Sequence, residues 1–428
     1  MHKPDYLTTL YIDFDAFFAH VEKQLSPKLH DKSVGVIPLP SAHSGLIACC
    51  YRAKSFGVKR GMRQPEAKAL CPDIVFLPAR HDVYVRIHHD IIQLVDRFMP
   101  VVRTWSIDEL ECRLPRLTQQ AALRLTQDMR AALERHIGAL ITPSIGLSSN
   151  QLLAKIAAEM DKPRGLIILH PDELPGKLFD VPLRAIPGIA RGIEYRLNRA
   201  GIFTVKDLWN IQPKHARAIW RNVEGERLWA QLHGYVTARP ETKRAMFAHG
   251  RILSGPWRRK DKARDCLTLL CAKAARRMRA ENFVATKLTV SLKHPSKRRY
   301  SHEIQFPPSR DDFTLLRAMR RAFARTAAAA QSQTYLSASV TLHGLRREGH
   351  YSQDLFEYNS APDNKAGYEN LSDIMDTLNK RYGGTKIYLG PRYEPPGGYA
   401  GAKIAFGRVP SLEDFQTLTP QRKQILRK

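Results

Sequence analysis

Two short stretches of this chain combine a strand-forming run with carboxylates, and they constrain its fold more than any other feature. Residues 7–14 are rich in apolar, β-branched and aromatic side chains, which predicts a buried strand with Asp13 next to its end. A helical pattern follows at once over residues 16–24. A strand that runs directly into a helix projects its last side chains from a rigid edge, where the helix N-terminal amides also point. We therefore expect Asp13 to lie in a ligand-binding cleft, and we interpret Asp15 as a cap of the helix.

The second stretch is Ser-Ile-Asp-Glu at residues 106–109. Residues 101–105 and 110–114 predict a hairpin with Asp108 and Glu109 near its tip. Neighbouring residues of a flat strand point to opposite faces, so the backbone must turn or bulge if both side chains bind metal. Three carboxylates from two segments can hold two Mg²⁺ ions about 4 Å apart. Because magnesium prefers oxygen ligands and keeps positions open for phosphate, the pattern predicts a two-Mg²⁺ centre for chemistry on a phosphate polymer.

The charge balance indicates the partner. The 428 residues include 68 Lys and Arg against 41 Asp and Glu, a net charge of +27. Such an excess favours nucleic acid, with an anionic membrane surface as the rival partner. No apolar run is long enough to span a bilayer, and no apolar signal segment follows the first residues. The six cysteines form no Cys-x-x-Cys pair and are interpreted as reduced thiols. We therefore expect a cytoplasmic protein without a membrane partner.

The first 240 residues divide by pattern into two parts. Strands and helices alternate through residue 170, which predicts an α/β domain with an insertion near residues 29–76. Residues 171–240 read as all-helical. Within them, Ile-Pro-Gly-Ile-Ala at residues 186–190 is spaced like a helix-hairpin-helix, in which Gly188 and Ala190 would present backbone N–H groups to a DNA phosphate. The alternative is an ordinary helix pair joined by a Pro-Gly turn.

The later chain predicts a second, basic domain. Residues 241–260 read as a linker, and residues 251–300 contain fifteen Lys or Arg against three Asp or Glu. A helix that carries residues 273–279, two strands over 286–292 and 299–305, a second helix over 312–329 and a strand over 337–342 predict a small α+β domain. The one-sided charge predicts DNA-backbone contacts, although a solvated face is the alternative; the candidates are Arg276, Arg277 and Arg279. Beyond residue 346 the chain is polar, and residues 391–401 read as loosely folded.

Five blocks in this order resemble the Y-family of translesion DNA polymerases, the family of bacterial polymerase IV and of the polymerase V catalytic subunit. The blocks are residues 11–19, 51–58, 106–109, 154–165 and 186–189. Residues 374–382 are similar to the tail of the polymerase V catalytic subunit. The resemblance implies an α+β multidomain, right-hand polymerase. Its parts would be a palm (1–28 and 77–170), fingers (29–76), a thumb (171–240), a little finger (245–345) and a polar C-terminal tail (346–428).

The resemblance also implies roles for single residues. Asp13, Asp108 and the backbone carbonyl of Phe14 would bind the nucleotide-bound Mg²⁺, and Glu109 would join both aspartates at the catalytic Mg²⁺. The nucleotide-binding residues would be Phe17, Phe18, Tyr51, Lys54 and Lys162, with Phe18 as the steric gate against a 2′-hydroxyl. The family often has Arg where this chain has Lys54, and a lysine gives a point charge without bidentate geometry. Ala16 and Ala48 would leave slack around the nascent base pair, which implies low fidelity, and no acidic cluster indicates a proofreading exonuclease.

The implied partners are primer–template DNA, dNTP, a sliding clamp and an accessory dimer as in polymerase V. Ser-Gln-Asp-Leu-Phe at residues 352–356 resembles a clamp-binding peptide, with Gln353, Leu355 and Phe356 as the contact residues. Two other functions compete with an active polymerase. One is a catalytically inactive Y-family-like accessory that binds DNA and the clamp. The other is a two-metal nuclease, but that function does not explain Phe18 or the predicted triphosphate-binding residues.

Overall fold

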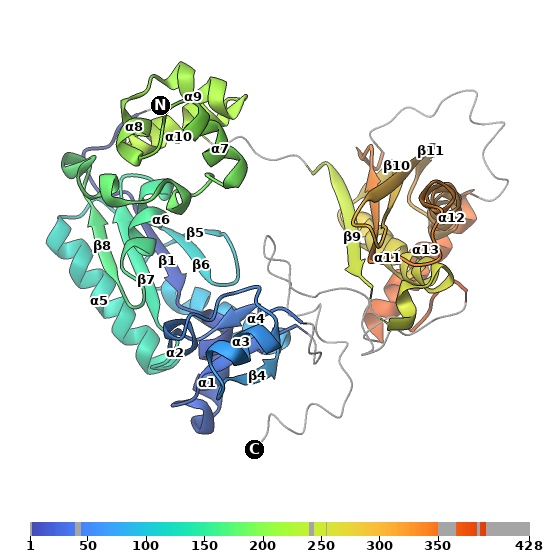
Figure 1. Cartoon of the computed structure of the whole chain (residues 1–428), viewed down its shortest axis with the longest axis horizontal. Helices are drawn as coiled ribbons and strands as arrows, with labels where there is room; N and C mark the ends of the chain where they lie inside the picture. Colours follow the sequence, from blue (N-terminus) through green and yellow to red (C-terminus); the bar gives the residue numbers. More distant parts are fainter. Residues whose placement is uncertain are drawn as a thin grey trace. The chain divides into compact units, whose positions relative to one another are not determined.

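The computed structural model describes residues 2–38, 44–238, 244–253, 255–349, 365–382 and 386–390. The chain forms two compact units, which divide in sequence at residues 240 and 241 (Figure 1). Among the described helices, none is long and apolar enough to cross a membrane.

A five-stranded sheet with the order β5-β6-β1-β7-β8 forms the centre of the first unit. Its strands are β1 (Thr9–Phe14), β5 (Val101–Thr104), β6 (Glu109–Arg113), β7 (Pro143–Ser148) and β8 (Leu166–Leu169). All neighbours run antiparallel except β7 and β8, so the alternation of strands and helices does not produce a parallel sheet. All six residues of β1 are buried, which confirms the strand predicted from its apolar run. The predicted hairpin is also confirmed, as β5 and β6.

Helix α6 (Gln151–Met160) packs against β7, β1 and β8 (Figure 1). Asn150 caps it, because its side-chain oxygen accepts a hydrogen bond from the Leu153 amide at 3.0 Å. Gly146 permits the close approach of helix and sheet, since a Cβ there would lie 2.0 Å from the Ala154 carbonyl oxygen. The helix is thereby fixed against the central strands, and its last turn lies beside the end of the sheet that carries Asp13.

Further helices and a small second sheet complete the first 170 residues. The sheet has the order β3-β2-β4 and corresponds to the predicted insertion. The elements are α1 (Phe17–Leu25), η1 (Pro27–Leu29), β2 (Val34–Ile37), β3 (Ala48–Cys49), α2 (Tyr51–Ser55), α3 (Gln64–Leu70), β4 (Val75–Pro78), α4 (His81–Val95) and α5 (Gln119–His136). The short strands β4 and β8 were not predicted, because each is a run of only four apolar residues, which is too short to show a strand period.

The segment from residue 171 to 238 is helical, as predicted. Its elements are η2 (Pro171–Glu173), η3 (Gly176–Asp180), η4 (Leu183–Ala185), α7 (Arg191–Arg199), α8 (Val205–Asn210), α9 (Pro213–Trp220) and α10 (Glu224–Leu232). Its buried core continues into α6 through Leu152, Leu153 and Ile156. This shared core attaches the helical segment to the central sheet.

The second unit contains a four-stranded antiparallel sheet with the order β11-β10-β12-β9. Its elements are β9 (Met246–Ile252), η5 (Gly255–Arg258), α11 (Lys260–Ala280), β10 (Phe283–Lys293), β11 (Arg299–Ser309), α12 (Asp312–Ala330), β12 (Ser337–His343) and β13 (Arg346–Arg347), which pairs with β10. Helices α11 and α12 pack on the sheet and on each other (Figure 1). Leu288, Val290 and Leu292 alternate inward and are fully buried, which is the period-2 pattern of a strand with one covered face.

The prediction of a linker over residues 241–260 is wrong, because β9 lies within it. This edge strand pairs with β12 but buries only Phe247 fully among its seven residues. An edge strand with so little apolar surface does not stand out from a basic, glycine-containing segment.

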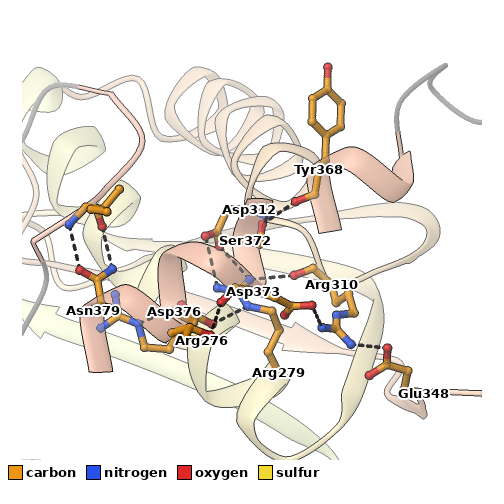
Figure 2. Close-up of polar contacts among 12 residues, drawn as sticks. Arg276, Arg279, Arg310, Asp312, Glu348, Tyr368, Ser372, Asp373, Asp376 and Asn379 are labelled. Carbon is orange, nitrogen blue, oxygen red and sulfur yellow. Dashed lines mark hydrogen bonds and ion pairs between the residues drawn. The ribbon is translucent and has the colours of Figure 1, made fainter. Parts of the chain in front are cut away.

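Helix α13 (Lys365–Arg381) packs on the second unit and was not predicted either. Figure 2 shows its inward face. Its buried positions are mixed: Ser372, Met375 and Asn379 are buried, while Leu371 and Ile374 are exposed. Because polar and apolar side chains share the buried side, hydrophobic periodicity did not reveal how the helix packs.

Candidate active site

The two predicted carboxylate segments lie side by side. Strands β1 and β6 are neighbours, and their register pairs Asp13 with Glu109. A third carboxylate comes from Glu159 in the last turn of α6, and oxygens of the three side chains all lie within 4.8 Å of one another. The pairing of Asp13 and Glu109 agrees with the sequence analysis, whereas Glu159 was not predicted as a site residue although it lies in one of the five blocks.

Asp108 lies in the turn immediately before β6, outside that three-carboxylate group. Its backbone oxygen accepts a hydrogen bond from the Phe14 amide at 2.8 Å, which joins the turn to the end of β1. The Ser106 hydroxyl donates to Asp108 Oδ1 at 2.5 Å and lies 3.1 Å from Glu109 Oε2. Burial raises the pKa of the Asp108 carboxyl, and the Ser106 hydrogen bond opposes that shift. The turn required by the sequence analysis is therefore present, and Ser106 lies between the two acids.

Two lysines form ion pairs with three of the carboxylates. The ammonium of Lys162 lies 2.8 Å from Asp13 Oδ2 and 2.7 Å from Glu159 Oε1. Lys155, on α6, forms an ion pair with Glu109 and lies 3.3 Å from the Tyr11 hydroxyl. The centre thus brings four carboxyl groups and two ammonium groups together, so acidic groups remain in excess.

The electrostatics of the centre reflect burial and these ion pairs. Burial raises the pKa of Asp13 to about 8, although the Lys162 ammonium acts in the opposite direction. Burial would also raise the pKa of Glu159, but the same ammonium outweighs it and lowers that pKa. A buried carboxyl with a raised pKa is a group that gains from a nearby cation.

Asp15 connects the acidic centre to the predicted triphosphate residues. It is only 2 % exposed, and its carboxylate accepts hydrogen bonds from the Ser144 hydroxyl at 2.9 Å and the Arg164 amide at 2.9 Å. The Tyr51 hydroxyl donates to it at 3.3 Å, and the Lys54 ammonium lies 4.0 Å from the centre of the Tyr51 ring. The interpretation of Asp15 as a helix cap is wrong, because α1 begins after Ala16 and has no side-chain cap.

The two phenylalanines at the start of α1 are buried. Phe18 stacks on Tyr84 with ring centroids 4.5 Å apart, and Phe17 lies 6.0 Å from Phe18. Ala16, which precedes them, has φ 45°, in the left-handed region that side chains seldom adopt. The chain passes from β1 into α1 over Asp15 and Ala16, and this turn places both rings next to the carbonyl end of β1.

The predicted DNA-contact residues differ in their surroundings. Gly188 has φ 95°, and Ala190 is the residue before α7, so both lie in a turn that leads into a helix. Arg276 forms an ion pair with Asp376, and Arg277 lies 3.2 Å from a ring nitrogen of His249. These four assignments remain predictions, and the clamp residues Gln353, Leu355 and Phe356 lie outside the described residues.

The prediction that Arg279 contacts DNA is wrong. Its side chain is 4 % exposed and lies between Asp312, at 3.1 Å, and Asp376, at 2.7 Å (Figure 2). A guanidinium that is buried and shared by two carboxylates cannot also reach a phosphate. The local run of basic residues on α11 gave no sign of this, since the two acids come from α12 and α13.

Carboxylates on neighbouring strands, with lysines beside them, define a class of site that can hold a divalent cation next to a phosphate group. Comparison with known proteins specifies the class further. Residues 12–159 match the impB/mucB/samB family, and residues 247–355 match the C-terminal domain of that family. The DNA polymerase IV of Moorella thermoacetica is 33% identical over 294 residues, which cover 67% of this chain and 73% of that protein. The chain belongs to the Y-family of translesion DNA polymerases, as its five sequence blocks predicted.

A second relative agrees with this membership, and two solved structures share the fold. The DNA polymerase IV of Pelotomaculum thermopropionicum is 36% identical over 202 residues, which span 46% of this chain and 50% of that relative. A Y-family DNA polymerase chimera of Dbh and Dpo4 has a similar fold, with a TM-score of 0.68 at 20% identity, over 80% of this chain and 100% of that one. An insertion ternary complex of Dbh DNA polymerase has a TM-score of 0.53 at 22% identity, over 78% of this chain and 98% of that one. The α+β multidomain class predicted from the sequence is confirmed.

Proposed function

We propose that this Y-family polymerase extends a primer on damaged template DNA, transferring a nucleotide from dNTP to the primer 3′ hydroxyl with two Mg²⁺ ions. The observation that carries the proposal is the pairing of Asp13 with Glu109 on adjacent strands, with Asp108 in the turn immediately before Glu109. Two segments almost a hundred positions apart in sequence thereby contribute oxygen ligands to one place. Mg²⁺ favours such an all-oxygen set.

The residues present fit two Mg²⁺ ions. Asp13, Asp108 and the Phe14 carbonyl would hold one, and both aspartates with Glu109 would hold the other. The ions would supply activation of the 3′ hydroxyl and charge stabilisation on the departing pyrophosphate. The buried carboxylates whose pKa values are raised support this assignment, because a cation offsets the cost of keeping them charged.

The chain's own polar residues would bind and orient the triphosphate. Lys162 has its ammonium beside Asp13, and Tyr51 and Lys54 are held near the same carboxylates through Asp15. Positive charge and a phenol donor near the γ-phosphate stabilise charge that grows as the bond breaks. Phe18 would lie under the sugar and exclude a 2′-hydroxyl by overlap.

Low fidelity without proofreading is part of the proposal. Ala16 and Ala48 leave space where the fingers and palm approach the nascent pair. The proposed partners are primer–template DNA and dNTP, with a sliding clamp bound through residues 352–356 and an accessory dimer as in polymerase V. The protein is proposed to act in the cytoplasm.

The test is single-nucleotide incorporation on primed DNA. Glu109→Ala should reduce incorporation roughly a hundredfold or more, since it removes a ligand needed in the transition state. DNA binding should stay near the parental value, because most phosphate contacts lie elsewhere. Glu134→Gln, an exposed acid on α5, is the matched control and should retain activity. Incorporation by Glu109→Ala within about threefold of the parent would contradict the assignment, and a parent that binds DNA but never extends it would favour the inactive accessory.

A further inference from the structure

Glu159 has no role in the mechanism proposed above, yet its side chain contacts residues of the acidic centre. Its carboxylate holds one side of the Lys162 ammonium at 2.7 Å, while Asp13 holds the other side at 2.8 Å. The positions of both partners are fixed. Glu159 lies on α6, which the close approach at Gly146 holds against the sheet, and Lys162 lies two residues before Arg164, whose amide donates to Asp15.

Sharing the ammonium has a consequence for Asp13. A divalent cation and an ammonium both draw on the charge of the same carboxylate, so each weakens the binding of the other. Lys162 must nevertheless stay close if it is to meet a triphosphate. A lysine has a flexible four-carbon stem and a strongly hydrated charge, so without a second partner it would turn to solvent.

We propose that Glu159 is a positioning residue for the incoming nucleotide, which keeps the Lys162 ammonium at the site while Asp13 binds Mg²⁺. This inference rests on the proposed function. Glu159 acts through Lys162 and lowers the cost of ordering that side chain, so its contribution falls on nucleotide binding. The half-exposed position of Glu159, 40% against 11% for the Asp13 side chain, suits a carboxylate at the entrance of the site.

The rival role is direct metal ligation, because oxygens of Glu159, Asp13 and Glu109 lie within 4.8 Å of one another. The two roles differ in their dependence on Lys162. A ligand acts whether or not the lysine is present, whereas a positioning residue has nothing to position once the lysine is gone. A double-mutant cycle therefore separates them.

The experiment measures dNTP affinity with the full chain bound to a dideoxy-terminated primer–template in Mg²⁺. The proteins are the parent, Glu159→Gln, Lys162→Ala and the double variant. Glu159→Gln should weaken dNTP binding about tenfold in the parent, the scale of a hydrogen bond to a charged group. In the Lys162→Ala background the same change should alter affinity by less than about twofold.

Incorporation kinetics provide a second measurement. Glu159→Gln should raise KM for dNTP while kcat at saturating nucleotide stays within about threefold of the parent. Glu159→Asp keeps the charge and should recover part of the lost affinity. Glu134→Gln controls for the loss of one negative charge elsewhere in the unit, and thermal unfolding of each variant controls for folding.

Each outcome decides the proposal. An equal, tenfold loss in both backgrounds would identify Glu159 as a metal ligand and overturn the positioning role. Parental affinity in Glu159→Gln would show that the contact is a bystander. If the parent itself neither binds dNTP nor extends the primer, the proposed function fails. An active parent with an unaffected Glu159→Gln variant overturns only the present inference.

Discussion

Single side chains in the site are held by a further shell of contacts, and Phe18 is the clearest case. Its ring stacks on Tyr84, whose hydroxyl donates to Glu22 at 2.6 Å. Glu22 in turn forms an ion pair with Arg80 at 2.5 Å. A ring supported in this way cannot rotate freely, which is what exclusion by steric overlap requires.

Shortening Phe18 should admit ribonucleotides. Phe18→Ala opens space at the sugar 2′ position and leaves the carboxylates in place, so the ratio of kcat/KM for dNTP over rNTP should fall about tenfold or more. The measurement is single-nucleotide incorporation with each substrate. Because removing a buried ring costs about 3–5 kcal/mol of stability, Phe18→Leu serves as a milder variant with an intermediate ratio. An unchanged ratio in both variants would remove Phe18 as the gate.

The sequence indicated some site residues and concealed others for a physical reason. Asp13, Asp108 and Glu109 stand next to strand-forming runs, so their position at a sheet end could be predicted. The roles of Asp15 and Ser106 depend on contacts with distant or turn residues, such as the hydrogen bond from Ser144 to Asp15. Nothing in the local pattern distinguishes an acid that binds metal from one that holds a neighbouring segment.

Helices and strands could be predicted where the local sequence pattern determines them, and could not where tertiary contacts do. The central strands and long helices were predictable from their apolar periodicity. Strand β9 and helix α13 were not, because β9 is an edge strand and α13 buries Ser372 and Asn379 together with Met375. Ion pairs also join α13 to the unit: Arg279 contacts Asp376, and Arg310 contacts Asp373 (Figure 2).

Asp376→Asn should destabilise the second unit. The Arg279 guanidinium is 4% exposed and has two charged partners. Removing one of them should lower the free energy of unfolding by about 1–3 kcal/mol. Because Asp312 remains, the loss should be smaller than for a fully unpaired buried charge. Asp373→Asn on the same helix is the control. Its side chain is 45% exposed, so its replacement should cost less than about 1 kcal/mol. Urea unfolding of the full chain measures both, and equal effects would mean that burial of Arg279 does not determine the cost.

The whole molecule carries a net charge of +27, much of it in the second unit. With Arg279 assigned to an interior ion pair, three exposed basic residues cluster at a hairpin end: Lys297 and Arg298 between β10 and β11, and Arg299 at the start of β11. An exposed hairpin end is a suitable place for phosphate contacts, which supply affinity independent of sequence.

DNA affinity should fall steeply with salt, and this hairpin end should contribute to the slope. Removing one basic side chain that binds a phosphate should reduce the log–log slope by roughly 0.9. Changing Lys297, Arg298 and Arg299 to Glu should weaken binding to any duplex at low salt, with parent and variant converging at high salt. Fluorescence anisotropy over a salt series measures this. A slope equal to the parent's would show that this end of the sheet does not contact DNA.

The predicted clamp-binding peptide would act on the whole molecule, because a tether to the clamp raises the local concentration of the enzyme at primer ends. Leu355→Ala together with Phe356→Ala should leave unaided primer extension intact and remove stimulation by a loaded clamp. Burying two such side chains contributes roughly 1.5–3 kcal/mol each, and linkage raises the concentration of the enzyme at primer ends. Primer extension with and without the clamp is the measurement. Equal stimulation of parent and variant would locate clamp binding elsewhere.

The ion pair between Arg279 and Asp376 also has a bearing on how such a chain can evolve. The match to the family's C-terminal domain ends at residue 355, whereas α13 begins at Lys365. A buried charge inside the shared domain therefore depends on a carboxylate supplied by the extension. A lineage without the extension would retain a poorly compensated guanidinium in the domain interior until Arg279 was replaced by an apolar residue. We therefore expect domain and extension to change together in evolution, because the loss of either leaves a charged partner in the other without its ion pair.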